Sequence, residues 1–382
     1  MRAKGLGKSE VLAKLRQAKA KDVCYRKGKI FSSMCTTPNS TAKRARELFV
    51  ESNLGDPGLF AGSLQLEKEA VSSLLELLHA PATAAGIIVS GGTEANLLAI
   101  YAARNAAKLA EPELVVPWSA HFSFDKICDI LRVKLVKADL NDEYTVDPKA
   151  VEACINANTI AIVGNVGSAE LGAVDNIGAL SKIAESHGLP LHVDAAFGGL
   201  VLPFLRELGY EVDDFDFSLN GVQSITVDPH KMGQVPVPAG GILFRNSDAT
   251  SCIRTGTPYL TEPFQCTFVG TRPGASAAAA WAAFESMGRE GFKRTVKRCI
   301  DLTAFLKDRL EKSNFEIIAK PTMNIVAFRT TNSKLLVDQL RKRGYFVSYV
   351  PRLDAVRIVL MPHLTKRHLI NFVQVLGELA KA

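Results

Sequence analysis

The chain has 382 residues, of which 47% are hydrophobic and 22% charged, with a formal net charge of +7. This composition supports one large domain and a smaller one with an ample core, and no apolar run is long enough to span a membrane. The basic amino terminus lacks the apolar core of a secretion signal, and the seven cysteines are scattered. We therefore expect a cytoplasmic protein with reduced thiols rather than a disulfide framework or a cysteine metal site.

The positive charge is concentrated at the amino terminus. Residues 1–50 hold thirteen Lys or Arg against three acidic residues, a net charge of +10, so the remaining chain carries −3. A basic arm can bind nucleic acid, but no recognised nucleic-acid motif accompanies this one. We instead expect a solvated amphipathic helix over residues 8–20, with Val11, Leu12 and Leu15 on one face. We predict that residues 1–50 form an arm at a dimer interface.

The middle of the chain alternates short apolar runs with helical patterns, which predicts a large domain over residues 51–272. The predicted strands are Gly86–Ser90, Leu114–Pro117, Lys134–Ala138, Thr159–Val163, Pro190–Asp194 and Ile225–Asp228, with Gly240–Arg245 as a further, antiparallel candidate. Helices are predicted over residues 93–109, 122–132, 147–156 and 176–187. Such alternation predicts a mostly parallel sheet covered on both faces.

An alanine-rich stretch from Gly274 to Phe284 predicts the start of a long helix that leads out of this domain. The remaining pattern predicts a small α+β domain within residues 273–382. Its predicted strands are Phe315–Ala319, Asn324–Phe328, Tyr345–Val350 and Val356–Leu360, and its predicted helices are Ser333–Lys342 and Thr365–Leu379.

Polar side chains follow several of the predicted strands at the point where each strand ends. They are Ser90, His121, Ser168, Asp194 and the pair His230-Lys231. Ligands of open parallel sheets bind at the carboxyl ends of the strands. The convergence of five loops by this rule is harder to explain by chance than any single motif.

Lys231 and Asp194 are the most informative of these residues. Lys231 follows the apolar run Ile225-Thr226-Val227, and Asp194 follows Leu191-His192-Val193. A lysine amine and a carboxylate at neighbouring strand ends are what pyridoxal 5'-phosphate (PLP) requires, as a covalent anchor and as a partner for the ring nitrogen. Burial and nearby positive charge are expected to depress the lysine pKa and make the amine nucleophilic. A surface lysine and an aspartate that caps a turn are the alternatives.

The run Ser90–Asn96 follows a predicted strand and opens a predicted helix. Its two glycines allow a ligand close approach to the backbone, and the free N–H groups with the Thr93 hydroxyl favour a phosphate. An ordinary glycine turn is the alternative. A Gly-x-Gly-x-x-Gly dinucleotide fingerprint is absent here.

Three further residues have candidate roles at the same edge. His121 can stack on the cofactor ring, although it can equally be a histidine at a helix start. Ser168 can hydrogen-bond the ring hydroxyl, and the small Ala196 leaves room for a flat ring. The other histidines lack metal-ligand spacing and are assigned to surface or packing roles, with His363 left open.

Taken together, these segments resemble the group II PLP-dependent decarboxylases, a branch of the aspartate-aminotransferase fold (fold type I). The matching segments are Ser90–Asn96, His121–Phe124, His192–Gly199 and Ser224–Gly233. Within that family the chain is similar in particular to archaeal L-tyrosine/L-aspartate decarboxylases, through Asn53–Phe60, Val89–Asn96 and Met361–His363. The resemblance covers about residue 30 to the end.

The resemblance implies a role for each matching residue. Lys231 would be the Schiff-base lysine, Asp194 the pyridinium partner and His121 the stacking residue. Gly92, Thr93 and His230 would contact the phosphate. The chain departs from many family members by having Ser168-Ala169 where they have two threonines. The stretch from Tyr259 to Arg272 is short and holds no other tyrosine, so Tyr259 and His121 both remain candidates for the proton donor.

The sequence thus predicts a homodimeric L-amino-acid decarboxylase. The resemblance implies L-tyrosine to tyramine, for methanofuran, or L-aspartate to β-alanine, for coenzyme A, and we rank tyrosine slightly ahead. A PLP-dependent aldehyde lyase of the sphingosine-phosphate-lyase type is an alternative, although such lyases usually bring a membrane anchor. A non-catalytic binding protein on the same fold is another alternative. No metal is expected.

Overall fold

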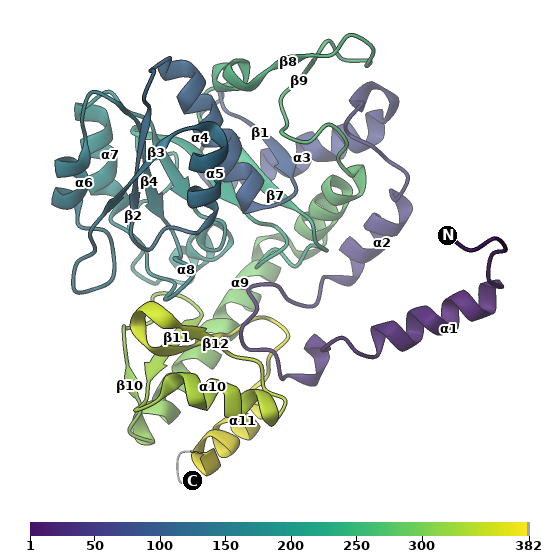
Figure 1. The fold of residues 1–382 in the computed structure, drawn as a ribbon, viewed down its shortest axis with the longest axis vertical. Helices are drawn as coiled ribbons and strands as arrows, with labels where there is room; N and C mark the ends of the chain where they lie inside the picture. Colours follow the sequence, from purple (N-terminus) through teal and green to yellow (C-terminus); the bar gives the residue numbers. More distant parts are fainter. Residues whose placement is uncertain (380–382) are drawn as a thin grey trace.

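A computed structural model describes residues 1–379 as a large α/β unit and a smaller unit joined by one long helix (Figure 1). No helix among these residues is both long and apolar enough to cross a membrane. The predicted fold class, a mostly parallel sheet with a smaller carboxyl-terminal α+β unit, is confirmed.

The large unit is built on a seven-stranded sheet. In spatial order the strands are β1 (Ala85–Val89), β7 (Gly240–Phe244), β6 (Val222–Val227), β5 (Leu191–Asp194), β4 (Thr159–Asn165), β2 (Glu113–Pro117) and β3 (Lys134–Ala138). The strands from β6 to β3 are parallel, whereas β7 runs antiparallel to both β1 and β6. The antiparallel strand expected over residues 240–245 is therefore confirmed, and β5 lies at the centre of the sheet.

Successive strand residues alternate between two apolar layers, as a sheet buried on both faces requires. Ile162 packs in one layer, while Val163 packs in the other. Helices α4 (Gly92–Ala107) and α5 (Ser123–Leu131) cover the second layer. The first is covered by α3 (Ala61–Leu77), α7 (Ile177–Ser186), α8 (Leu202–Glu207) and part of α9, and α6 (Pro148–Cys154) packs on α7.

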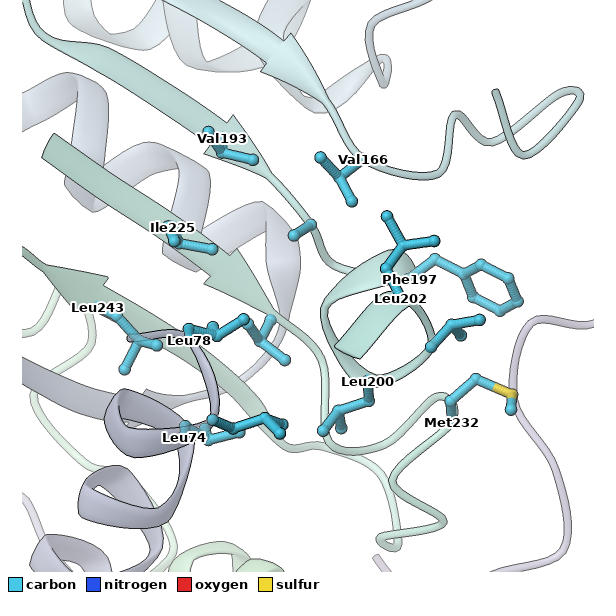
Figure 2. Close-up of a cluster of buried hydrophobic side chains, with 14 of the residues drawn as sticks. Leu74, Leu78, Val166, Val193, Phe197, Leu200, Leu202, Ile225, Met232 and Leu243 are labelled. Atoms are coloured by element: carbon cyan, nitrogen blue, oxygen red, sulfur yellow. The ribbon is translucent and has the colours of Figure 1, made fainter. Parts of the chain in front are cut away.

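Figure 2 shows the first layer beneath the carboxyl ends of the central strands. Leu74 and Leu78 approach Ile225 and Leu243 of the sheet, and Met232 completes the cluster. Met232 is 1% exposed and directly follows Lys231, so the turn that carries the lysine is anchored in the core.

The connecting helix α9 (Gly274–Lys312) is interrupted at Gly288, where φ is 54°. It leads to a four-stranded antiparallel sheet in the order β10 (Glu316–Ile317), β11 (Ile325–Arg329), β13 (Ala355–Val359) and β12 (Ser348–Val350), with helices α10 (Ser333–Lys342) and α11 (Lys366–Leu379). The strand predicted over residues 345–350 is shorter in the structure, because Phe346 forms an isolated bridge with Ile30 instead.

Part of the amino-terminal segment packs against the small unit, and part of it projects away from the rest of the chain. Phe31 is fully buried in the core of the small unit. The His363 Nε2–H donates to the Ile30 carbonyl at 2.8 Å, and its Nδ1 lies 3.0 Å from the Thr36 hydroxyl. His363, left open in the sequence, therefore ties this segment to the small unit.

Among the remaining helices, one agrees with the sequence prediction and three were not predicted. The helix α1 (Lys8–Lys19) agrees with the prediction over residues 8–20, and Figure 1 shows it standing off from the rest of the chain. The helices α2 (Ser40–Leu48), α3 and α8 were not predicted. A short hairpin, β8 (Thr255–Gly256) and β9 (Phe264–Gln265), projects from the large unit.

Candidate active site

A cavity of about 380 Å³ opens at the edge of the large sheet where the parallel strands end. It is lined by every residue predicted for the site: Gly92, Thr93, His121, Ser168, Asp194, Ala196, His230 and Lys231. These residues come from the segments that follow β1, β2, β4, β5 and β6. The structure therefore brings all of them together, as the strand-end rule requires.

Lys231 reaches into this cavity from the turn after β6. Its Nζ lies 3.0 Å from Oδ2 of Asp228, which is 2% exposed. Burial acts to lower the pKa of the Lys231 amine, but the carboxylates of Asp228 and Asp194 outweigh burial and raise the pKa above the ordinary lysine value. The depressed pKa expected from the sequence is therefore wrong, because two carboxylates share the pocket with the amine.

The amino-terminal end of α4 forms one wall of the cavity. A Cβ on Gly92 would lie 3.0 Å from Asp228 Oδ2 and 3.3 Å from the Ala196 methyl group, so only glycine leaves this cradle open. Gly240 is constrained more tightly, since its Cβ would lie 2.4 Å from the Cα of Gly91. The first N–H groups of α4 remain free to bind an anion such as a phosphate.

Asp194 ends the central strand and is 9% exposed. Its Oδ1 accepts a hydrogen bond from the Ala196 N–H at 3.1 Å, and its Oδ2 accepts one from the Asn96 side-chain amide at 2.9 Å. These two donors hold the buried carboxylate in place and satisfy one lone pair on each of its oxygens.

A polar chain behind Asp194 fixes the orientation of Asn96. The Asn96 Oδ1 accepts from the Thr226 hydroxyl at 2.7 Å and lies 3.1 Å from His192 Nε2, while His192 Nδ1 lies 2.8 Å from the Ser224 hydroxyl. Burial lowers the pKa of His192 to about 4, so the imidazole is neutral with its proton on Nε2. The Asn96 amide N–H is thereby directed at Asp194. The default packing role given to His192 thus includes orienting this network.

His121 lies in the segment between β2 and α5 and lines the cavity. Its Nδ1 accepts a hydrogen bond from the Ser123 N–H at 3.2 Å, which leaves Nε2 as the protonated nitrogen. Burial lowers the pKa of His121, although the Asp194 carboxylate acts in the opposite direction. The imidazole is consequently suited to stack as a neutral ring.

Ser168 and His230 also line the cavity. The Ser168 hydroxyl accepts a hydrogen bond from the Ala173 N–H at 3.1 Å, so its own proton can be donated to a ligand. His230 donates from Nδ1 to the Ala239 carbonyl at 2.5 Å, which turns Nε2 toward Asp228, 3.8 Å from its Oδ2. Both residues keep one polar atom available on the cavity side.

Sequence reasoning gave no role to three residues that shape the site: Asn96, Asp228 and Arg357. Asn96 and Asp228 lie inside motifs that were recognised, so only their individual functions were missed. Arg357 carries a signal of its own, because it is an arginine in the middle of the apolar strand Ala355–Val359.

Arg357 lines a second cavity, of about 410 Å³, which shares Met34, His121 and Ala169 with the first. Its Nη1 donates weakly to the Ser32 carbonyl and the Ser348 hydroxyl at 3.4 and 3.3 Å, and its buried Nε has no partner within residues 1–379. Burial lowers the pKa of Arg357 to about 10, with a smaller opposing effect from Glu170. A half-buried cation in this state is ready to bind a carboxylate.

Tyr259 does not line either cavity in this chain. It is 86% exposed in the loop between β8 and β9, and that loop is held by hydrogen bonds from Thr261 to Asp56. Of the two candidate proton donors, only His121 is positioned within the cavity of a single chain. No group of three His, Cys, Asp or Glu side chains within residues 1–379 could hold a metal ion.

The donor set of the cavity fits PLP. A lysine amine, a buried carboxylate, a glycine cradle at a helix amino terminus and a histidine converge on a space of about 380 Å³. Together with the seven-stranded sheet they define a PLP-dependent enzyme of fold type I.

Comparison with known proteins narrows this class to one family. Residues 62–331 match the model described as "Pyridoxal-dependent decarboxylase conserved domain", so the chain belongs to the pyridoxal-dependent decarboxylase family. The family and cofactor inferred from the sequence are thereby confirmed.

Several curated relatives cover almost the whole chain. An L-aspartate/L-glutamate decarboxylase from Pyrococcus horikoshii is 47% identical over 98% of both chains. An L-aspartate decarboxylase from Thermococcus kodakarensis is 48% identical over 99% of this chain and 98% of its own. A probable L-tyrosine/L-aspartate decarboxylase from Methanothermobacter thermautotrophicus is 48% identical over 90% of this chain and 95% of its own.

Solved structures share the fold. A sphingosine-1-phosphate lyase from Burkholderia pseudomallei aligns with a TM-score of 0.91 at 27% identity, over all of this chain and 92% of its own. A glutamate decarboxylase from Lactobacillus brevis aligns with a TM-score of 0.89 at 21% identity, over 99% of this chain and 93% of its own, and supports the fold alone.

His192 provides a test of the buried network through the pH dependence of stability. Its pKa falls from 6.5 to about 4 on folding, so the unfolded chain binds more protons between these values. The His192 contribution is therefore present above pH 6.5 and is lost as the pH falls toward 4, a change of about 3 kcal/mol. We expect His192→Gln to lose less unfolding free energy than the wild type between pH 6.5 and 4, measured by urea denaturation.

Subtracting the unfolding free energy of the variant from that of the wild type at each pH removes the contributions of other titrating groups. One of these is Asp175, whose pKa burial raises to about 6 and whose contribution to stability changes with pH in the opposite direction. Parallel curves for the two proteins across this window would show that His192 does not titrate there.

Proposed function

We propose that this enzyme converts L-aspartate to β-alanine and carbon dioxide, with PLP held by Lys231. The observation that carries the catalytic part of the proposal is the convergence of Lys231 and Asp194 in one cavity lined by the other predicted residues. The substrate is supported by Arg357 and by the activities for which relatives at 47 and 48% identity are named. We extend the proposal to a cytoplasmic location and to supply of β-alanine for coenzyme A.

When bound, PLP supplies a conjugated ring that accepts the electron pair left behind as carbon dioxide departs. Lys231 would hold the cofactor covalently between turnovers. Asp194, oriented by Asn96, would pair with the ring nitrogen. Thr93, His230 and the free N–H groups of α4 would bind the phosphate.

The remaining residues would orient the ring and protect it. Ser168 would donate its free proton to the ring hydroxyl, and Ala196 would contact one face of the ring. His121 would cover the opposite face and exclude water there. We keep both His121 and Tyr259 as candidates for the group that protonates Cα, with Tyr259 requiring a different position from the exposed one it has in this chain.

Arg357 supports an acidic substrate for an energetic reason. An ion pair with the carboxylate that departs would stabilise the ground state and be lost in the transition state, which slows the reaction. An ion pair with the side-chain carboxylate of aspartate persists throughout. We therefore assign Arg357 to that side-chain carboxylate.

L-Tyrosine is the second candidate substrate, with methanofuran as the pathway that its tyramine product would serve. It is supported by the relative from Methanothermobacter thermautotrophicus, whose name includes both substrates. The sequence resemblance ranked tyrosine slightly ahead; Arg357 reverses that order in our proposal, because the phenol side chain offers no carboxylate for the guanidinium.

An aldehyde lyase is the alternative reaction, and the likeness to the Burkholderia pseudomallei lyase is the observation in its support. Product analysis separates the two reactions. Release of carbon dioxide and an amine from an amino acid supports decarboxylation, whereas release of an aldehyde from a phosphorylated amino alcohol supports the lyase.

We also propose that the enzyme is a homodimer to which the amino-terminal segment contributes. The apolar face of α1 supports this: Val11, Leu12 and Leu15 are 41%, 40% and 59% exposed, and α1 has no buried residue. A second copy of the chain would remove this stripe from water.

The catalytic roles are tested by two substitutions and a carbon dioxide assay with L-aspartate. We expect Lys231→Ala to abolish turnover and the visible absorbance of lysine-bound PLP. We expect Asp194→Asn to keep the fold and bind PLP, but to lower kcat by at least about 100-fold because the ring nitrogen loses its anionic partner. Normal turnover in Lys231→Ala, or near-wild-type kcat in Asp194→Asn, would contradict these roles.

The substrate assignment is tested by Arg357→Met. We expect kcat/KM for L-aspartate to fall by roughly 100-fold, since a buried carboxylate loses its charged partner, while kcat/KM for L-tyrosine changes little. Arg329→Met on the neighbouring strand β11 removes an arginine paired with Glu316 and is the matched control. Equal losses for both amino acids would instead assign Arg357 to the α-carboxylate.

A further inference from the structure

Asp228 is a buried acid that the reaction outlined above does not use. It is 2% exposed and lies three residues before Lys231, in the turn whose backbone is closed by the Lys231 N–H donating to the Asp228 carbonyl at 2.9 Å. Its Oδ2 contacts the Lys231 amine at 3.0 Å, whereas its buried Oδ1 has no hydrogen-bond partner within residues 1–379. Ionised carboxylates are rarely left half-satisfied in this way unless they serve a nearby charge.

The position of Asp228 is also unusual for an anion. Its Oδ2 lies beside Gly92, in the cradle where the α4 amino terminus is suited to a phosphate. A carboxylate and a phosphate side by side repel each other in a pocket of low dielectric constant. A positive charge close to Asp228, such as the Lys231 amine at 3.0 Å, offsets this repulsion.

Five groups face this part of the pocket and set its charge balance. Lys231 is the cation in contact with Asp228, and His230 Nε2 lies 3.8 Å from the same oxygen. Asp194 also attracts the Lys231 charge. His121 and Cys35 interact with Lys231 as well, and burial lowers the pKa of His121 and raises that of Cys35, so both favour their neutral forms.

We propose that Asp228 is a positioning residue for Lys231, holding the ε-ammonium in the cavity whenever the lysine is not bonded to the cofactor. This inference rests on the proposed PLP chemistry. When Lys231 reacts as a nucleophile, the ammonium must lose one proton, and Asp228 Oδ2, 3.0 Å away, can accept it. The carboxyl group then becomes neutral beside the phosphate. The proton stays within the pair, and two anions are never placed together without a cation.

The role of Asp228 has a consequence for reactivity. The carboxylate raises the pKa of the Lys231 amine. Lys231 is thus held as an ammonium at neutral pH until Asp228 accepts its proton. Removing the carboxylate leaves burial as the dominant effect and makes the amine reactive at lower pH.

The test measures the amine itself in full-length protein stripped of PLP with hydroxylamine. Acetic anhydride labels only the neutral amine, so the pH midpoint of Lys231 labelling, read by mass spectrometry, reports its titration. We expect a midpoint above the ordinary lysine value of about 10.4 in the wild type. Asp228→Asn is expected to lower the midpoint by about 1–3 pH units, and Asp228→Glu to return it toward the wild-type value.

PLP capture provides a second readout in the same proteins. We expect Asp228→Asn to acquire PLP absorbance at neutral pH about tenfold faster for each unit by which the midpoint falls. Asp216→Asn is the matched control. It removes another buried carboxylate, 1% exposed and paired with His79, that precedes β6 and so lies toward the opposite edge of the sheet.

The outcomes separate this inference from the proposed function. A wild-type midpoint below the ordinary lysine value, or equal midpoints in the wild type and Asp228→Asn, would overturn the role of Asp228. Should Asp228→Asn fail to fold, the wild-type midpoint alone decides. A protein that acquires no PLP contradicts the proposed function instead, whatever the labelling shows.

Discussion

The structure depends on a carboxylate buried at the end of its central strand. Asp194 lies at a position with little access to water, where a carboxylate is unfavourable unless both of its oxygens have polar partners. The Ala196 N–H and the Asn96 amide supply two hydrogen bonds, and a protonated ring nitrogen would supply the remaining partner. The need to orient Asn96 explains why a neutral histidine, a threonine and a serine are buried behind it.

Buried carboxylates also determine the charge balance around Lys231. The amine shares its pocket with two carboxylates, and their attraction outweighs burial. Cofactor binding must therefore redistribute charge as well as fill space. Gly92 leaves room for an anion beside Asp228, and the free N–H groups at the start of α4 can hydrogen-bond that anion. The pocket is thus arranged around pairs of charges rather than around a single reactive residue.

Much of this arrangement could be predicted from particular residues, because the parallel strands end in polar turns at one sheet edge. The strand over residues 134–138 and the helix over residues 333–342 agree with prediction to the residue. The helix α3 begins directly after the motif Asn53–Phe60 and was not predicted. The Lys231 pKa was wrongly predicted because the turn from Asp228 to Lys231 brings the carboxylate next to the amine, and this turn could not be derived from the sequence. The role of Arg357 was missed because the contact between the small unit and the large unit cannot be derived from local sequence patterns.

We propose above all that Lys231 and Asp194 bind the same PLP molecule, Lys231 through a covalent bond and Asp194 through the ring nitrogen. The most direct measurement is an experimental structure of the protein after incubation with PLP. The account predicts continuous density from the Lys231 Nζ to the cofactor, with the ring nitrogen about 2.7–2.9 Å from an Asp194 oxygen and the phosphate at the amino terminus of α4. Cofactor density attached elsewhere, or a ring nitrogen that faces another group, would contradict it.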